Sequence, residues 1–486
     1  MVRVHARPDT RRFLPAALVG GIVLFALTIR LWMFVGITRL DMFRYLELSH
    51  HVLQGGSLFD KGVFYASSRL TLIAPLLLSN KLFGYGEHVS VIWPLLCSLG
   101  SVVVAYLLVR ELWGELAGVL AAFGMAVVPL EVQLATQLLP DAIEGFFVVL
   151  AVLLAVLAIK RDRHHVAYAV GSGAAIGLAY FTRINAIVFL PGLLLLGALL
   201  EPKKWRRSLW ALAGLAGVLV AAAGVFWVLS GDPLVDWHRT GQFYQSYTEV
   251  GFRPTLETFR TMIVTIPSLQ WMVPALLIGL ALFAIRRGRE ELVMLVWAVG
   301  FFVYADFIGP LHGLDRAPST FRYLEPMTLP LVALVAAAAA ILSRRSRTTW
   351  QRALPVAATL LVGIALLHPA ADAVRSTRYS MRWIAVRKAA ISAAYKQRVV
   401  VVLQDGASLE AFNYFSGYVL RRDACAPANA SVNTGARLFA LKEADLAPGS
   451  LFVATTTPDP YGHTGRLLAK YKPYPEGALK MFEILR

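Results

Sequence analysis

Two aspartates lie where polar chemistry could take place at a membrane surface. Asp41 follows a long apolar run with almost no spacer, and Asp141 directly precedes another apolar run. A carboxylate at such a boundary is partly desolvated, and it can accept a proton as a general base. Arg44 lies one helical turn after Asp41, on the same face of a predicted helix. Helix capping is the alternative for each aspartate, and it is a strong one for Asp141 because Pro140 comes directly before it.

Arginines supply the complementary charge. Arg183 lies in a short turn between two apolar runs, Arg69 opens a short apolar segment, and Arg322 lies in the loop before a late apolar run. Arg30 lies inside the first apolar run, where an ionisable residue is costly and often functional. Snorkelling to lipid headgroups is the alternative for each of them. Because guanidinium groups bind phosphate through two parallel hydrogen bonds, we expect an outer-face set to bind a lipid phosphate: Arg183, Arg69, Arg44 and Arg322.

Other polar and aromatic side chains of the same loops are candidates for binding an acceptor or a sugar: Glu47, His50, Tyr45 and Tyr244. An aromatic ring such as that of Tyr244 can stack on a sugar, but it can equally belong to an aromatic belt at the membrane surface. His50 and His51 could ligate a metal, although a hydrogen-bonded or interfacial role is commoner. Asp41 and Asp141 could share a divalent cation. No cofactor is certain from the sequence.

The composition places these residues in a membrane protein. Of the 486 residues 57% are hydrophobic and 16% are charged, yet the formal net charge is +17. The mean hydropathy is +0.60. Soluble domains are about 45–50% apolar and about 25% charged, so a soluble globular enzyme, a disordered chain and a fibrous repeat are excluded. The chain also has too little polar surface for a nucleic-acid binder. Its two cysteines, Cys97 and Cys425, show no zinc-site spacing.

Apolar runs of the length that a bilayer requires predict a polytopic α-helical protein with eleven membrane spans. The expected spans are 14–36, 89–109, 116–132, 142–159, 166–181, 185–200, 208–230, 268–285, 290–309, 326–343 and 351–368. A twelfth apolar segment, 70–83, is short and contains Pro75, Asn80 and Lys81. By hydropathy alone it could be a span or an interfacial helix.

The charges of the loops decide the orientation. With eleven spans and the N-terminus in the cytoplasm, the short basic clusters all fall on the cytoplasmic side, in loops 1–13, 110–115, 160–165, 201–207, 286–289 and 344–350. A further span at 70–83 would move these clusters outside, so we expect that segment at the outer face. Asp41, Asp141 and Arg183 then lie outside, in a multi-pass protein of the cytoplasmic membrane.

The polar stretch 369–486 is predicted to form a small extracytoplasmic α/β domain that follows the membrane domain 1–368. Strands are expected at 399–403, 450–457 and 480–485, and a helix at 409–420. No active-site motif is evident in it, and a docking or lid domain is the expected role.

Motifs in a particular order give the chain a family resemblance. They are LDMFRYLELSHHVLQGG in the first loop, KLFG before the second span, RELWG, LPD, GLAYFTR and FRYLEP. Together they resemble the GT-C superfamily of polytopic glycosyltransferases, which includes protein O-mannosyltransferases, aminoarabinose transferases and dolichyl-phosphate-mannose-dependent mannosyltransferases. The resemblance covers about residues 20–340. Many relatives have Asp-Glu in the first loop, whereas this chain has Asp41-Met42.

The resemblance implies a GT-C fold with interfacial helices and an extracytoplasmic active site. Asp41 then corresponds to the catalytic base, Asp141 to the second loop acid, and Arg183 to the basic residue after the fifth span. The implied reaction is an inverting transfer from a polyprenyl-phosphate sugar to a hydroxyl of a glycan, lipid or protein, without nucleic acid as a partner. Two alternatives remain, a transporter or flippase of lipid-linked sugars and a non-catalytic membrane assembly partner.

Overall fold

The computed structural model describes residues 10–60, 65–240, 259–304, 321–378, 451–454, 465–471 and 479–484. The chain divides into two compact units. Unit 1 comprises residues 1–35, 65–79 and 91–374, and unit 2 comprises residues 36–64, 80–90 and 375–486. Each unit is described by itself.

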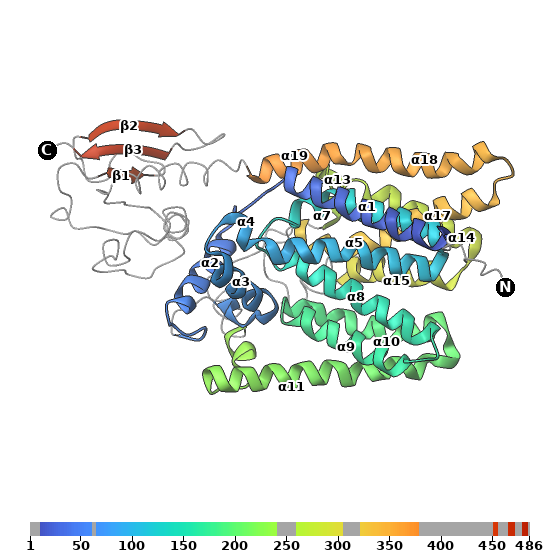
Figure 1. Cartoon of the computed structure of the whole chain (residues 1–486), viewed down its shortest axis with the longest axis horizontal. Coiled ribbons are helices and arrows are strands. Elements are labelled where there is room, and N and C mark those ends of the chain that lie inside the picture. The colour runs from blue at the N-terminus through green and yellow to red at the C-terminus, as the bar shows by residue number, and fades with distance from the viewer. Residues whose placement is uncertain are drawn as a thin grey trace, which may run out of the picture. The chain divides into compact units, whose positions relative to one another are not determined.

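Unit 1 is a bundle of apolar helices (Figure 1). Its long helices are α1 (Thr10–Trp32), α5 (Ile92–Trp113), α6 (Glu115–Val127), α8 (Asp141–Lys160), α9 (His165–Tyr180), α10 (Phe189–Leu200), α11 (Trp210–Ser230), α14 (Met272–Arg286), α15 (Arg289–Val303), α17 (Thr328–Arg345) and α18 (Thr349–Ala365). A helix therefore lies at each predicted span. Within the described residues, six helices are long and apolar enough to cross a membrane, so the total of eleven spans stays a prediction.

Short elements connect these helices. They are η1 (Tyr65–Ser68), α3 (Leu70–Phe83), α7 (Pro129–Leu134), η2 (Ile184–Val188), η3 (Pro202–Leu209), α13 (Phe259–Thr265), η5 (Phe321–Met327) and α19 (Leu367–Arg378). The segment 70–83 is thus a helix, as expected, and its placement at the outer face stays a prediction.

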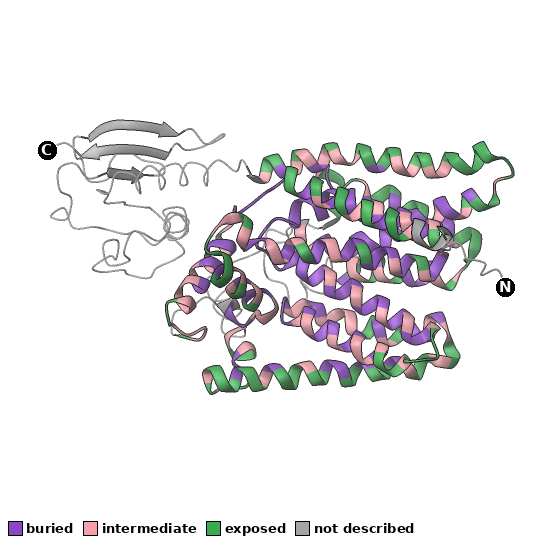
Figure 2. Ribbon diagram, in the orientation of Figure 1, coloured by how far each residue is buried: buried purple, intermediate pink, exposed green. Residues whose placement is uncertain are grey.

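The helices of the bundle differ in how far they are buried (Figure 2). In α8, 78% of the apolar window lies inside the protein, whereas the window that contains α18 is only 11% buried. In α11, Trp227 and Val228 are exposed although the helix is strongly apolar. An apolar helix whose side chains remain exposed suits a lipid environment, and α8 forms the interior of the bundle.

Small residues allow α9 and α11 to pack closely. A Cβ atom added at Gly173 would collide with the carbonyl oxygen of Ala211, and one added at Gly214 would collide with that of Val170. Glycines at such a crossing let two backbones approach each other, as is common between membrane helices. This close packing determines the position of α9, and therefore also the position of the turn that contains Arg183.

Unit 2 contains α2 (Leu40–Leu53), α4 (Glu87–Ser90) and a three-stranded antiparallel sheet. The strands β1 (Leu451–Ala454), β2 (Gly465–Tyr471) and β3 (Leu479–Ile484) have the order β1-β3-β2. The strands predicted at 450–457 and 480–485 are confirmed as β1 and β3, and β2 was not predicted. The strand expected at 399–403 and the helix at 409–420 lie outside the described residues. The domain boundary near residue 368 stays a prediction.

Candidate active site

Helix α2 presents a polar stripe that includes Asp41. Asp41, Arg44, Glu47 and His50 recur at every third position and are all half-buried, whereas the residues between them are buried. The helix begins at Leu40 with Arg39 as its N-cap, so Asp41 lies in the first helical turn and is not the cap. A carboxylate in the first turn is stabilised by the helix dipole. The stripe brings together four of the residues predicted for the site.

The opposite face of α2 and the two histidines are engaged in packing and hydrogen bonding. Tyr45 is fully buried. The ring of His50 makes an edge contact with Tyr85, and burial lowers the pKa of His50 although Glu47 opposes this shift. His51 Nε2 lies 2.8 Å from Asp60 Oδ2. His51 thus follows the hydrogen-bonded alternative, and the described residues contain no group of three or more His, Cys, Asp or Glu side chains that could hold a metal ion.

In unit 1, Asp141 and Arg183 form a buried ion pair. Arg183 Nη2 lies 2.9 Å from Asp141 Oδ1, and Arg183 Nη1 lies 3.2 Å from Glu144 Oε2. Pro140 is the N-cap of α8, so Asp141 lies in the first helical turn and does not occupy the cap position. The arginine follows α9 in an extended conformation, with φ of −155°, and this conformation turns the chain into η2.

The element η5 adds Arg322 and Tyr323 to this pair. Arg322 Nη1 lies 3.8 Å from Asp141 Oδ2. The ring centroid of Tyr323 lies 4.4 Å from Cζ of Arg183 and 5.4 Å from Cζ of Arg322. A tyrosine ring close to two guanidinium groups stabilises both through cation–π contacts. The structure therefore brings together three predicted residues, Asp141, Arg183 and Arg322, whose roles stay predictions.

Two further buried acids adjoin this group. Glu325 hydrogen bonds with Glu131 and lies near Glu144 and Asp141. Both Glu131 and Glu325 are buried. Glu131, Glu144, Tyr323 and Glu325 were not among the site residues predicted from the sequence. Glu131 and Glu144 lie within predicted spans and Glu325 directly precedes one, so the rule that ionisable residues at membrane depth are functional could have found all three acids.

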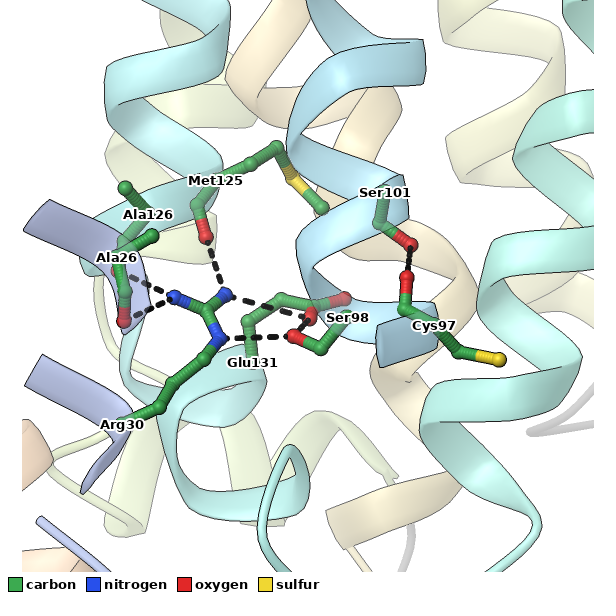
Figure 3. Close-up of polar contacts among 8 residues, drawn as sticks. All are labelled: Ala26, Arg30, Cys97, Ser98, Ser101, Met125, Ala126 and Glu131. Atoms are coloured by element: carbon green, nitrogen blue, oxygen red, sulfur yellow. Dashed lines mark hydrogen bonds and ion pairs between the residues drawn. The ribbon is translucent and has the colours of Figure 1, made fainter. Parts of the chain in front are cut away.

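Arg30 lies inside the protein and does not snorkel (Figure 3). Its exposed fraction is 0%, and its Nε donates to Ser98 Oγ over 2.9 Å. Its Nη atoms reach the carbonyl oxygens of Met125 and Ala126, each over 3.2 Å. Ser98 in turn donates to Glu131 Oε2 over 2.8 Å, and Arg30 Nη2 lies 3.9 Å from the same oxygen. The guanidinium group of Arg30 thus joins α1 to α5, α6 and α7.

A second polar group surrounds Arg69. Burial raises the pKa of Asp236, while hydrogen bonding from Ser68, the charge of Arg69 and hydrogen bonding from Tyr180 oppose the shift. Arg239 Nη1 donates to Ser67 Oγ over 3.1 Å. Arg239, which is distant in the chain, therefore reaches the short segment 67–69 that contains Arg69.

The turn after α9 connects the two polar groups. Tyr180 contacts Asp236, Thr182 Oγ1 lies 2.6 Å from Thr71 Oγ1, and Arg183 pairs with Asp141. Tyr180 thus contacts the segment 232–240, Thr182 contacts α3, and Arg183 contacts α8. Of the remaining predicted residues, Tyr244 lies outside the described residues.

Comparisons with known proteins give a consistent picture. The family model of dolichyl-phosphate-mannose-protein mannosyltransferase matches residues 74–227. The protein named "Putative mannosyltransferase YkcB" from Bacillus subtilis (strain 168) is 30% identical over 151 residues, which are 30% of this chain and 21% of that relative. The match thus spans about a fifth of the relative's length.

Solved structures are similar over more of the chain. ArnT from Cupriavidus metallidurans bound to undecaprenyl phosphate has a TM-score of 0.62 at 13% identity, with 98% of each chain covered. The archaeal oligosaccharyltransferase AglB from Archaeoglobus fulgidus, in complex with an inhibitory peptide and a dolichol-phosphate, has a TM-score of 0.56 at 14% identity, with 84% of this chain and 64% of that chain covered. At these identities the likeness shows a shared fold.

Proposed function

We propose that this chain, which belongs by its fold to the GT-C superfamily of membrane glycosyltransferases, transfers a sugar from a polyprenyl-phosphate donor to a hydroxyl acceptor. Transfer takes place on the extracytoplasmic face and inverts the configuration at the anomeric carbon. The acceptor is a glycan, a lipid or a protein.

The observation that carries this proposal is the presence of Arg69 and Arg239 at segment 67–69. Arg239 donates to Ser67, Arg69 lies two residues further along the chain, and the carboxyl group of Asp236 lies near Arg69. Two guanidinium groups at one short segment match the needs of a phosphate group whose negative charge grows from one towards two as the polyprenyl phosphate leaves. We therefore assign the donor phosphate to Arg69 and Arg239, at the start of α3.

The other arginine pair has a different role in this proposal. Arg183 is held by the carboxylates of Asp141 and Glu144, and Arg322 lies near Asp141. An additional anion beside so many carboxylates would be repelled. In this proposal Arg183 and Arg322 therefore have a structural role beside the site, and Asp141 positions them.

Asp41 is the general base of the proposed reaction. As the acceptor hydroxyl attacks the anomeric carbon, its proton passes to the carboxylate of Asp41. The new bond joins the acceptor oxygen to the anomeric carbon while the bond from that carbon to the phosphate oxygen breaks. The polyprenyl phosphate leaves with its bonding electrons, and the guanidinium groups of Arg69 and Arg239 stabilise its charge. A single displacement of this kind inverts the anomeric configuration.

Substitution of Asp41 tests the base. Purified protein in detergent is incubated with radiolabelled polyprenyl-phosphate sugars and a panel of hydroxyl acceptors. We expect Asp41→Asn to lower kcat by at least about a hundredfold, the usual contribution of a positioned base, because an amide cannot take up the proton.

Asp60→Asn is the matched control, because Asp60 is a carboxylate of the same unit that hydrogen bonds with His51. It should retain transfer. Full activity of folded Asp41→Asn would contradict the assignment of the base. Movement of a lipid-linked sugar across the membrane without a covalent product would instead favour a transporter.

A further inference from the structure

We propose that Glu131 and Glu325 share a single proton. This carboxyl pair stabilises the packing of η5 against α7 and α8. The position of η5 in turn keeps Arg322 and Tyr323 beside Arg183. The inference concerns the architecture of the buried group. It does not depend on the proposed transfer reaction.

The contact between the two carboxyl groups requires a proton. The exposed fractions of Glu131 and Glu325 are 1% and 3%, and their side chains hydrogen bond with each other. Glu131 Oε2 accepts from Ser98, as Figure 3 shows. Among the described residues, no donor reaches Glu131 Oε1 or Glu325 Oε2. Ionised carboxyl groups only accept hydrogen bonds, so two of them can bond to each other only if one carries a proton.

The charge balance of the buried group agrees with one proton. Within the described part of the chain, the group contains three guanidinium groups, those of Arg30, Arg183 and Arg322, and four carboxyl groups, those of Glu131, Asp141, Glu144 and Glu325. With one proton shared by Glu131 and Glu325, the charges of these seven side chains cancel. A buried group with a net charge is far more costly than a neutral one.

The surface of α8 is shaped to receive Glu325. A Cβ atom added at Gly145 would collide with both carboxyl oxygens of Glu325. The carboxyl group therefore lies directly against the backbone of α8, one residue after Glu144. No residue with a side chain could occupy position 145 without displacing it.

The other elements that pack against η5 bring few charges to this point. The groups that face Glu325 are Glu131 from α7 and Asp141 and Glu144 from α8. In α15 the charged residues are confined to its first turn at 289–291, and in α17 they are confined to its last turn at 344–345. The helix α13 contributes Arg260. The carboxyl pair is thus one polar link between η5 and the interior of the bundle, beside the contact of Arg322 with Asp141.

This link determines where two site residues lie. Arg322 and Tyr323 precede Glu325 by three and two residues in the same short helix. Anchoring Glu325 therefore sets the position of the Tyr323 ring beside Arg183 and of Arg322 near Asp141. Glu325 acts in this proposal as a positioning residue, through the side chains of its own element.

Infrared difference spectroscopy of the purified protein tests the shared proton. The carbonyl-stretch band of a protonated carboxyl group should be present in the wild type and lost in both Glu131→Gln and Glu325→Gln, because either amide supplies the hydrogen bond and leaves the remaining carboxylate ionised. Glu111→Gln is the control, since Glu111 forms an ordinary ion pair with Arg161, and the band should persist. Absence of the band from the wild type, or its persistence in either pair variant, would overturn the proposal.

Thermal unfolding tests the anchoring. Glu325→Ala should lower the unfolding midpoint, and Glu325→Gln should restore most of it. Tyr323→Leu should lower the midpoint in the wild type and in Glu325→Gln, but have little further effect in Glu325→Ala, because η5 is already released there. Strictly additive effects of Tyr323→Leu and Glu325→Ala would overturn the positioning role. If Glu325→Ala does not fold, Glu131→Ala takes its place in the same cycle. None of these readouts uses a sugar donor, so they remain decisive if the chain transfers no sugar.

Discussion

At the scale of single residues, the molecule separates two uses of arginine. Arg183 is almost fully buried and is held by two carboxylates, whereas Arg69 lies near a half-buried acid, Asp236, and Arg239 donates to Ser67. Breaking a buried ion pair leaves an uncompensated charge and costs about 3–5 kcal/mol. Losing a charge-assisted hydrogen bond to a ligand costs about 1.5–3 kcal/mol and affects substrate binding and transfer more than folding.

The two arginine groups should therefore respond differently to alanine substitution. We expect Arg239→Ala to lower kcat/KM for the polyprenyl-phosphate donor by roughly tenfold or more, with a smaller change in the unfolding temperature than Arg183→Ala causes. Arg183→Ala should lower the unfolding temperature clearly, because Asp141 and Glu144 lose their partner. Steady-state kinetics and thermal unfolding in detergent measure the two effects. The reverse pattern would assign the donor phosphate to Arg183.

At the scale of elements, the crossing of α9 and α11 decides where the connecting turn lies. The turn after α9 carries Tyr180, Thr182 and Arg183, and each of these contacts a different part of the site. The crossing itself depends on Gly173 and Gly214, which lie against carbonyl oxygens of the partner helix. A substitution at this crossing should therefore alter the position of the site residues although it contacts none of them.

Gly214→Leu tests this dependence. The added side chain would collide with the backbone of α9, and overpacking of this kind costs about 1–3 kcal/mol. We expect a lower unfolding temperature and reduced sugar transfer. Gly217→Leu is the matched control, because it lies on the same helix and an added Cβ atom meets nothing within 4 Å. Equal stability of the two variants would show that the crossing tolerates a side chain.

At the scale of the whole molecule, the net charge of +17 is explained by the predicted orientation. Short basic segments such as the one in η3, with the sequence PKKWRRSL, join helices on the side that we expect to be cytoplasmic. The acids and arginines of the candidate site lie at the opposite ends of those helices. The positive charge thus orients the protein, and only a few arginines are expected to contact substrate.

Cysteine labelling tests this orientation. In a variant without Cys97 and Cys425, Gln54→Cys should react with a membrane-impermeant maleimide in intact cells. Arg287→Cys should react only after the membrane is permeabilised. Both positions are exposed in the structure, so access to them depends on the side of the membrane. The opposite labelling pattern would invert the topology and place the candidate site in the cytoplasm.

The sequence by itself determined where the helices lie and which residue types occur at their ends. Hydropathy is a local property, so apolar runs predicted a helix at every expected span, and the positions of Asp41, Asp141 and Arg183 at the ends of those runs could be read directly. The order of the motifs also predicted the GT-C fold, in agreement with the similarity to ArnT and AglB.

Only the tertiary structure decided which side chains meet. Arg183 and Asp141 are 42 residues apart in the chain, and Arg239 and Ser67 are 172 apart, so no local pattern could pair them. Hydropathy left open whether Arg30 snorkels, and the packing of α1 against α5 and α6 placed its guanidinium group inside the protein. The partners of a buried charge depend on how helices pack, because a charge that leaves water must find its compensation in whichever segments the fold brings next to it.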